Sequence, residues 1–200
     1  MADDMVERLH EALRRTREFT AGRLATGLSH EGADDTVGTI GTDDAHGFDP
    51  LPLLRSLHEA GARVVVIGQV AGILHGSTEL TGDLDLLWDG DPVQAQLLTA
   101  AFRAVGARLS DGAGASVPLG PDAFLRPKVQ FASPGASGDC CTPALPWGSL
   151  AVADFLDRAQ TVADPGGFEV HYVRRADLIR MRRAVGRPKD LRRAEELERL

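Results

Sequence analysis

The sequence has only two cysteines, Cys140 and Cys141, and they are adjacent. Neighbouring residues of a strand point to opposite faces, so a disulfide between these two would be strained. The paired spacing of a zinc site is also missing. Both thiols are therefore expected to be reduced, with one of them facing the core, as is typical of a cytoplasmic protein.

Long apolar runs are missing as well. No stretch approaches the length that spans a bilayer, and the first residues lack the basic start and apolar run of a signal peptide. The sequence thus predicts a protein that stays in the cytoplasm and has no membrane partner.

An excess of positive charge is also lacking, since the formal net charge is -7. Binding of nucleic acid by the whole surface is therefore not expected. One segment near the C-terminus is nevertheless strongly basic. Its nine basic residues are Arg174, Arg175, Arg180, Arg182, Arg183, Arg187, Lys189, Arg192 and Arg193. Two interpretations stay open: a solvated helix face, or a local phosphate-binding surface.

The composition divides the chain into three parts. Residues 1–20 have apolar residues at helical spacing among charges and predict an amphipathic helix. Residues 21–48 are rich in Gly, Asp, Thr and Ser, and we expect a flexible linker because so few large apolar residues are present. Residues 49–200 are expected to form one compact domain, with C-terminal helices over 176–200.

Apolar patterning within residues 49–200 predicts an alternation of helices and strands. The expected helices cover 51–60, 69–75, 92–106, 152–159, 176–185 and 189–200, and the expected strands cover 63–67, 83–88, 107–109, 129–133, 139–142 and 168–173. This order favours an α+β fold with a small mixed sheet flanked by helices.

The most informative segment is Thr81-Gly82-Asp83-Leu84-Asp85-Leu86. Residues two apart in a strand share a face, so Asp83 and Asp85 are expected to project together while the leucines face the core. Two neighbouring carboxylates repel one another unless a cation lies between them, and Mg²⁺ prefers such oxygen ligands. The alternative is a pair of exposed aspartates that only aid solubility.

A glycine turn precedes this strand. Gly68 ends the buried run Val64-Val65-Val66-Ile67, and its backbone N–H groups are suited to holding phosphates. The segment contains no Gly-Lys-Ser/Thr, which excludes a P-loop, and its glycines are spaced by four, which excludes the dinucleotide fingerprint.

Four blocks in this order resemble the DNA polymerase β-type nucleotidyltransferase superfamily, in particular its bacterial branch of abortive-infection type IV toxins and minimal nucleotidyltransferases. The blocks are Val66-Ile67-Gly68-Gln69-Val70-Ala71 through Gly76-Ser77, Thr81-Gly82-Asp83-Leu84-Asp85, the hairpin Val129–Ser133 and Asp139–Pro143, and Asp177–Arg182 through Gly186-Arg187-Pro188-Lys189-Asp190. The resemblance covers about Leu54 to Leu197 and implies a nucleotidyltransferase-like fold.

The resemblance also implies roles for particular residues. Asp83, Asp85 and Asp139 would be the catalytic and metal-binding carboxylates for Mg²⁺ or Mn²⁺, with Asp139 holding the second ion or accepting the proton of the attacking hydroxyl. The nucleoside triphosphate would be bound by Gly68, Gln69, Ser77, Arg182, Arg187 and Lys189. Two alternatives stay open: Asp139 as a turn residue after Gly138, and residues 186–190 as a simple helix break.

The resemblance implies an Mg²⁺-dependent enzyme that moves NMP from an NTP to a hydroxyl of RNA or protein. A toxin with a separately encoded antitoxin would fit the same branch. Gln69 stands where the family usually has a small residue, and Arg182 replaces its Lys. These departures motivate the alternative of a turnover-deficient protein that binds a nucleotide or a partner. A third hypothesis is RNA binding by the basic C-terminal helices.

Overall fold

The computed structural model describes residues 2–200, and the side chains of all of these except residues 2–5 and 31. Its α-helices are α1 (Ala2–Thr20), α2 (Leu51–Glu59), α3 (Gly68–Leu74), α4 (Pro92–Ala104), α5 (Pro121–Phe124), α6 (Ala153–Asp157), α7 (Arg175–Val185) and α8 (Pro188–Arg199). Its strands are β1 (Val64–Ile67), β2 (Asp85–Trp88), β3 (Arg108–Ser110), β4 (Ser116–Val117), β5 (Lys128–Ala132), β6 (Ser137–Cys141), β7 (Gln160–Ala163) and β8 (Glu169–Tyr172).

All eight of these strands form one mixed sheet in the order β4-β3-β5-β6-β2-β1-β8-β7. The pairs β2–β6 and β1–β8 are parallel, and the other neighbours are antiparallel. The predicted α+β class is confirmed. The sheet is larger than expected because the short strands β4 and β7, which have no clear apolar alternation, extend its two edges.

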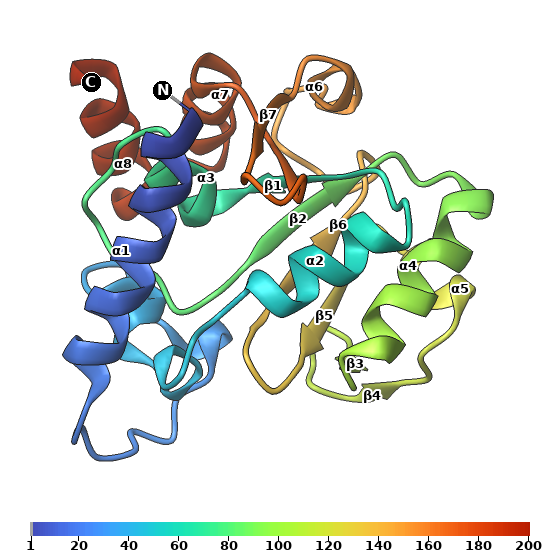
Figure 1. Ribbon diagram of the computed structural model, residues 1–200, viewed down its shortest axis with the longest axis horizontal. Helices are drawn as coiled ribbons and strands as arrows, with labels where there is room; N and C mark the ends of the chain where they lie inside the picture. The colour runs from blue at the N-terminus through green and yellow to red at the C-terminus, as the bar shows by residue number, and fades with distance from the viewer. Residues whose placement is uncertain (1) are drawn as a thin grey trace.

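The centre of the sheet is apolar on both faces. All four residues of β1 are buried, and so are Leu86, Leu87 and Trp88 of β2. In Figure 1, α2 and α4 lie across one side of the sheet, while α1, α3, α7 and α8 gather near one end of the central strands. Strands covered on both faces read as continuous apolar runs, as the sequence has here.

The N-terminal helix belongs to the same body as the sheet. Leu9 and Leu13 of α1 are 3% and 2% exposed and join the main hydrophobic core. The helix packs against α3 and β7. Its amphipathic pattern therefore serves intramolecular packing.

Residues 21–48 differ from the flexible linker that their composition suggests. They contain three short 3-10 helices, η1 (His30–Gly32), η2 (Gly38–Gly41) and η3 (Asp43–Ala45). Ile40, Ala45 and Phe48 are buried, and Arg23 donates hydrogen bonds to the carbonyl oxygens of residues 40 and 42. A few buried residues and many polar contacts thus order a segment that lacks an apolar pattern.

Close packing against Gly82 explains how this segment is held. A Cβ at Gly82 would lie 2.6 Å from the Cβ of Ala45 and 2.8 Å from the Thr39 carbonyl oxygen. Any larger residue would displace the segment from the start of β2. The glycine that the sequence places before the two aspartates therefore makes room for residues 39–45.

Cys140 and Cys141 are both free and buried. Within residues 2–200, none of the helices combines the length and apolar character that crossing a membrane would require.

Candidate functional site

The parallel pair β2–β6 brings the three predicted carboxylates to one place. Leu86 pairs with Cys140, so Asp85 and Asp139 occupy equivalent positions one residue earlier in the two strands. Neighbouring residues at one level of a sheet project from the same face. Asp83 lies two residues before Asp85, just ahead of β2, and all three line one cavity. Tertiary structure thus joins two segments that are more than fifty residues apart.

Asp85 carries the electrostatic signature of this clustering. Burial raises the pKa of the Asp85 carboxyl well above its ordinary value, and the charges of Asp83 and Asp139 raise it further. Neighbouring carboxylates that share one cavity cannot all ionise without a compensating positive charge. A cation bound beside Asp85 would therefore stabilise the ionised form of this carboxyl.

Two basic side chains, Lys128 and His30, partly balance the negative charge at Asp139. Lys128 Nζ lies 3.2 Å from Asp139 Oδ2, and His30 Nε2 lies 3.8 Å from Oδ1. Burial raises the pKa of Asp139, but His30 and Lys128 outweigh it, and the net shift is downward. Burial likewise disfavours the His30 cation, yet Asp139 and Asp44 outweigh this effect and raise the pKa of His30 to about 10. His30 is thus an imidazolium at neutral pH.

Asp83 is held by hydroxyl groups. Thr39 Oγ1 donates to Asp83 Oδ1 at 2.8 Å, and Thr81 Oγ1 donates to the same oxygen. The two threonine hydroxyls are themselves 2.8 Å apart. Thr39 belongs to η2. The segment of residues 21–48 therefore supplies the Thr39 hydroxyl that bonds to Asp83 and the His30 side chain that lies beside Asp139.

Gly68 is required where the chain turns from β1 into α3. Its φ is +65°, and a Cβ there would lie 2.0 Å from Asp85 Oδ2. Both the left-handed backbone and the close approach exclude other residues. The predicted glycine turn therefore borders the carboxylates directly.

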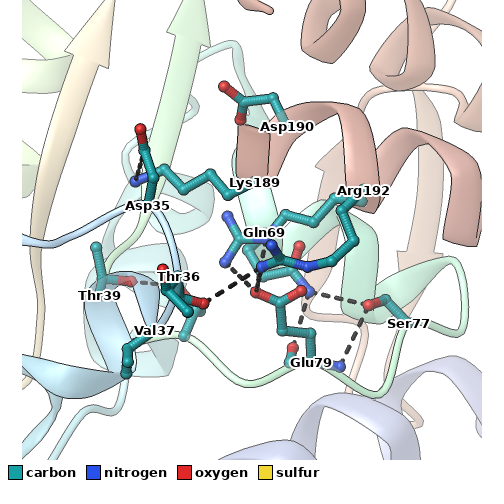
Figure 2. A network of polar contacts seen from close by, with 12 residues as sticks. Asp35, Thr36, Val37, Thr39, Gln69, Ser77, Glu79, Lys189, Asp190 and Arg192 are labelled. Atoms are coloured by element: carbon teal, nitrogen blue, oxygen red, sulfur yellow. Dashed lines mark hydrogen bonds and ion pairs between the residues drawn. The ribbon is translucent and has the colours of Figure 1, made fainter. Parts of the chain in front are cut away.

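Gln69 and Arg182 form a buried polar network beside this turn. Arg182 Nη2 donates to Gln69 Oε1 at 2.7 Å, and Gln69 Nε2 donates to Ser77 Oγ at 2.9 Å and to the Glu79 carbonyl at 2.8 Å. In Figure 2, dashed lines join Gln69 to Ser77 and to Glu79. Burial, with the nearby Arg193, lowers the pKa of Arg182 to about 10.

This network changes the interpretation of three predicted phosphate ligands. Gln69, Ser77 and Arg182 are 3%, 6% and 5% exposed, and each is bonded to protein groups. Their side chains hold α3 against α7, so the bulk of Gln69 is directed into the network. Gln69 and Arg182 nevertheless line the cavity of the carboxylates, whereas Ser77 is not among its lining residues.

Of the two other predicted basic residues, Arg187 is exposed to solvent, whereas Lys189 is buried. Arg187 is half exposed and pairs with Asp190, whose carboxylate raises the pKa of the guanidinium. Lys189 Nζ lies 3.6 Å from Asp35 Oδ1, and Figure 2 shows its side chain reaching from α8 to that residue. Both residues line the cavity of the carboxylates.

That cavity has a volume of about 450 Å³. This is within the range of sites for small molecules and cofactors. Carboxylates from β2 and β6, the Gly68 turn, and basic residues of β5, α7 and α8 share its walls. Such a mixture of acids and bases suits a ligand that arrives as a complex of a cation and an anion.

The donor set fits Mg²⁺ or Mn²⁺ chemically. Asp139 Oδ1 is a buried oxygen that accepts no hydrogen bond within the described residues, which leaves an acceptor for a cation. Asp83 and Asp85 add the carboxylates that hard cations prefer. Within the same residues, however, no group of three or more His, Cys, Asp or Glu side chains is already arranged as a metal-ligand set. Asp139 is instead balanced by Lys128 and His30.

Sequence reasoning missed His30, Thr39 and Lys128. A signal existed for Lys128, because the hairpin register pairs Gln130 with Asp139 and Lys128 is on the same face as Gln130. No comparable signal existed for His30 and Thr39, which lie in the segment of low hydrophobicity. Their position depends on tertiary packing alone.

Comparison with models of known protein families gave no match, and comparison with curated proteins gave none either.

Proposed function

We propose that this protein is an Mg²⁺-dependent nucleotidyltransferase of the polymerase β-like fold, which transfers NMP from an NTP to a hydroxyl group. The observation that carries the proposal is the convergence of Asp83, Asp85 and Asp139 on a cavity that Gly68 also borders. The raised pKa of Asp85 supports it, because burial and, after it, the charges of Asp83 and Asp139 disfavour ionisation of this carboxyl.

In this reaction the carboxylates and the basic residues of the cavity would have separate roles. Asp83 and Asp85 would hold the metal ions, which supply charge neutralisation at the triphosphate. Asp139 would hold a second ion or accept the proton of the acceptor hydroxyl. As the hydroxyl oxygen bonds to the α-phosphorus, the bond from that phosphorus to the bridging oxygen breaks and pyrophosphate leaves. Arg187 and Lys189 would face the phosphates after release from Asp190 and Asp35.

Incubation with each labelled NTP and Mg²⁺ or Mn²⁺ tests this proposal. The full chain should transfer label to RNA or to protein and release pyrophosphate. The double variant Asp83→Ala/Asp85→Ala should lose this activity, whereas Asp122→Ala, at an exposed position in α5, should keep it. Incorporation that survives the double substitution would refute the site.

A turnover-deficient binding protein is the second candidate. It is favoured by the contact between Lys128 and Asp139 and by the lack of a ready metal-ligand set among the side chains that the structure describes. Calorimetry distinguishes the two functions. NTP binding without pyrophosphate release would support the second candidate. Activity gained in Gln69→Gly would then assign the loss to this residue.

The acceptor is proposed to be an RNA end or a protein side chain, and the biological role that of a toxin neutralised by a separate antitoxin. These proposals rest on the resemblance of the motifs. Growth arrest on expression of the wild-type chain, absent with Asp83→Ala/Asp85→Ala, is the expected result.

A further inference from the structure

The cavity of the carboxylates has a second wall that the proposed chemistry does not use. This wall is apolar and consists of Leu145, Pro146 and Trp147 from the loop after β6, and Leu178, Met181 and Val185 from α7. Residues 178, 181 and 185 follow one another at helical spacing and therefore share one face of α7. A single cavity thus has a charged side and an apolar side.

Part of the apolar wall is accessible. Leu178 and Met181 are buried and form its base, but Val185 is 40% exposed and Trp147 is partly exposed. The loop lies against the same end of α7, because a Cβ at Gly148 would be 3.4 Å from the Ala184 carbonyl oxygen. Trp147 and Val185 are the chain neighbours of Gly148 and Ala184, which make this contact, and both line the cavity.

We infer that Trp147 and Val185 form a nucleobase-binding subsite, so that the ligand of the cavity is a purine or pyrimidine nucleotide with its phosphates at the carboxylates. The inference rests on the proposed function and adds the element that selects a nucleotide over a simple polyphosphate. A nucleoside triphosphate has a planar ring with apolar faces at one end and a metal-binding chain at the other. The two walls match these two ends.

An indole and an aliphatic side chain suit a base because every base has a π-face. Stacking of this kind tolerates different bases, and its loss weakens binding by roughly tenfold per stacked base. The wall offers few polar groups for base edges, so discrimination among the four bases is expected to be weak.

Tryptophan fluorescence gives a direct readout. The chain has two tryptophans, and Trp88 is completely buried in β2. A change in emission on ligand binding that is seen in the wild type and is absent in Trp147→Phe reports on Trp147. The probes are α,β-methylene analogues of the four NTPs with Mg²⁺, which resist cleavage at the bond that the reaction breaks, and inorganic tripolyphosphate with Mg²⁺.

The variants separate the subsite from the phosphate half. Trp147→Ala should weaken binding of the analogues by about tenfold, to the level of tripolyphosphate, while tripolyphosphate binding is unchanged. Calorimetry measures both, because this variant lacks the fluorophore. Trp147→Phe should retain most of the affinity. Val185→Ser should weaken the analogues only, and Val93→Ser, an exposed valine of α4, is the matched control.

The outcomes are distinguishable from failure of the enzymatic proposal. Equal affinities for analogues and tripolyphosphate, or analogue binding unaffected by Trp147→Ala in a chain that still melts at the wild-type temperature, would overturn the subsite even if NMP transfer occurs. Binding of analogues through Trp147 without NMP transfer from NTPs would support the subsite and refute the activity. Absence of binding by every probe would overturn both.

Discussion

Among single residues, Arg182 illustrates how a basic side chain can be structural in a candidate phosphate site. It is buried, and it donates to the carbonyl oxygens of Arg193 and Gly68 as well as to Gln69 Oε1. Five donors in a fixed fork satisfy several acceptors at once, which a lysine ammonium cannot do in the same geometry. Arg182 therefore satisfies the Gln69 amide oxygen and two backbone carbonyl oxygens together.

Removal of Arg182 should destabilise the fold strongly. Arg182→Ala leaves the buried Gln69 amide oxygen without its donor and removes the contacts to the carbonyl oxygens of Gly68 and Arg193, and we expect a loss of about 3 kcal/mol in the free energy of unfolding. Urea unfolding followed by circular dichroism measures this. The control is Arg183→Ala, next in sequence but more than half exposed, with an expected loss below about 1 kcal/mol. Similar losses in the two variants would contradict the role given to the network.

Among the elements, the segment of residues 21–48 contributes side chains directly to the site. It contacts the carboxylate strands through His30 and Thr39, and α8 holds it from the other side through Lys189 and Arg192. Figure 2 shows both α8 side chains directed at Asp35 and Thr36. The segment is thereby clamped between α8 and the sheet.

Burial within this segment should be visible in its stability. Ile40 is buried and Val37, three residues earlier, is 46% exposed. Ile40→Ala should lower the free energy of unfolding by about 2 kcal/mol, whereas Val37→Ala should change it by less than about 0.5 kcal/mol. Thermal and urea unfolding give both values. If both substitutions were neutral, the segment would behave as the loose linker that its composition suggests.

Across the whole molecule, ionisation of Asp85 in the candidate site opposes folding. Three carboxylates face one cavity, and folding holds them closer than the unfolded chain does. Because the pKa of Asp85 is raised in the folded state, ionisation of this group costs folding free energy. That penalty is absent below the ordinary aspartate pKa, grows as the pH rises through the folded pKa, and is complete above it.

Neutralisation of Asp85 should therefore stabilise the chain when no divalent cation is present. We expect Asp85→Asn to raise the free energy of unfolding at pH 7 by about 1 kcal/mol in EDTA, with Asp122→Asn as a neutral control. Addition of Mn²⁺ should raise the melting temperature of the wild type and have a smaller effect on Asp85→Asn. A destabilised Asp85→Asn chain with no response of the wild type to Mn²⁺ would contradict a cation site here.

The sequence alone determined the central architecture. Val64–Ile67 and Leu86–Trp88 form buried strands because their apolar runs leave no other stable arrangement, and Asp91 with Pro92 begins α4 because its side chain caps the helix. The pair Asp83 and Asp85 and the Gly68 turn were visible for the same reason. Each depends on local spacing that a short window of sequence contains.

Only the tertiary structure decided what surrounds those aspartates. Asp139 reaches them through parallel pairing of β2 with β6, and His30 and Thr39 reach them from a segment with no apolar period. Likewise, Arg182 of α7 donates to Gln69 of α3 because these two helices pack together. These contacts are set by the packing of elements distant in sequence, so no local pattern of residues contains them.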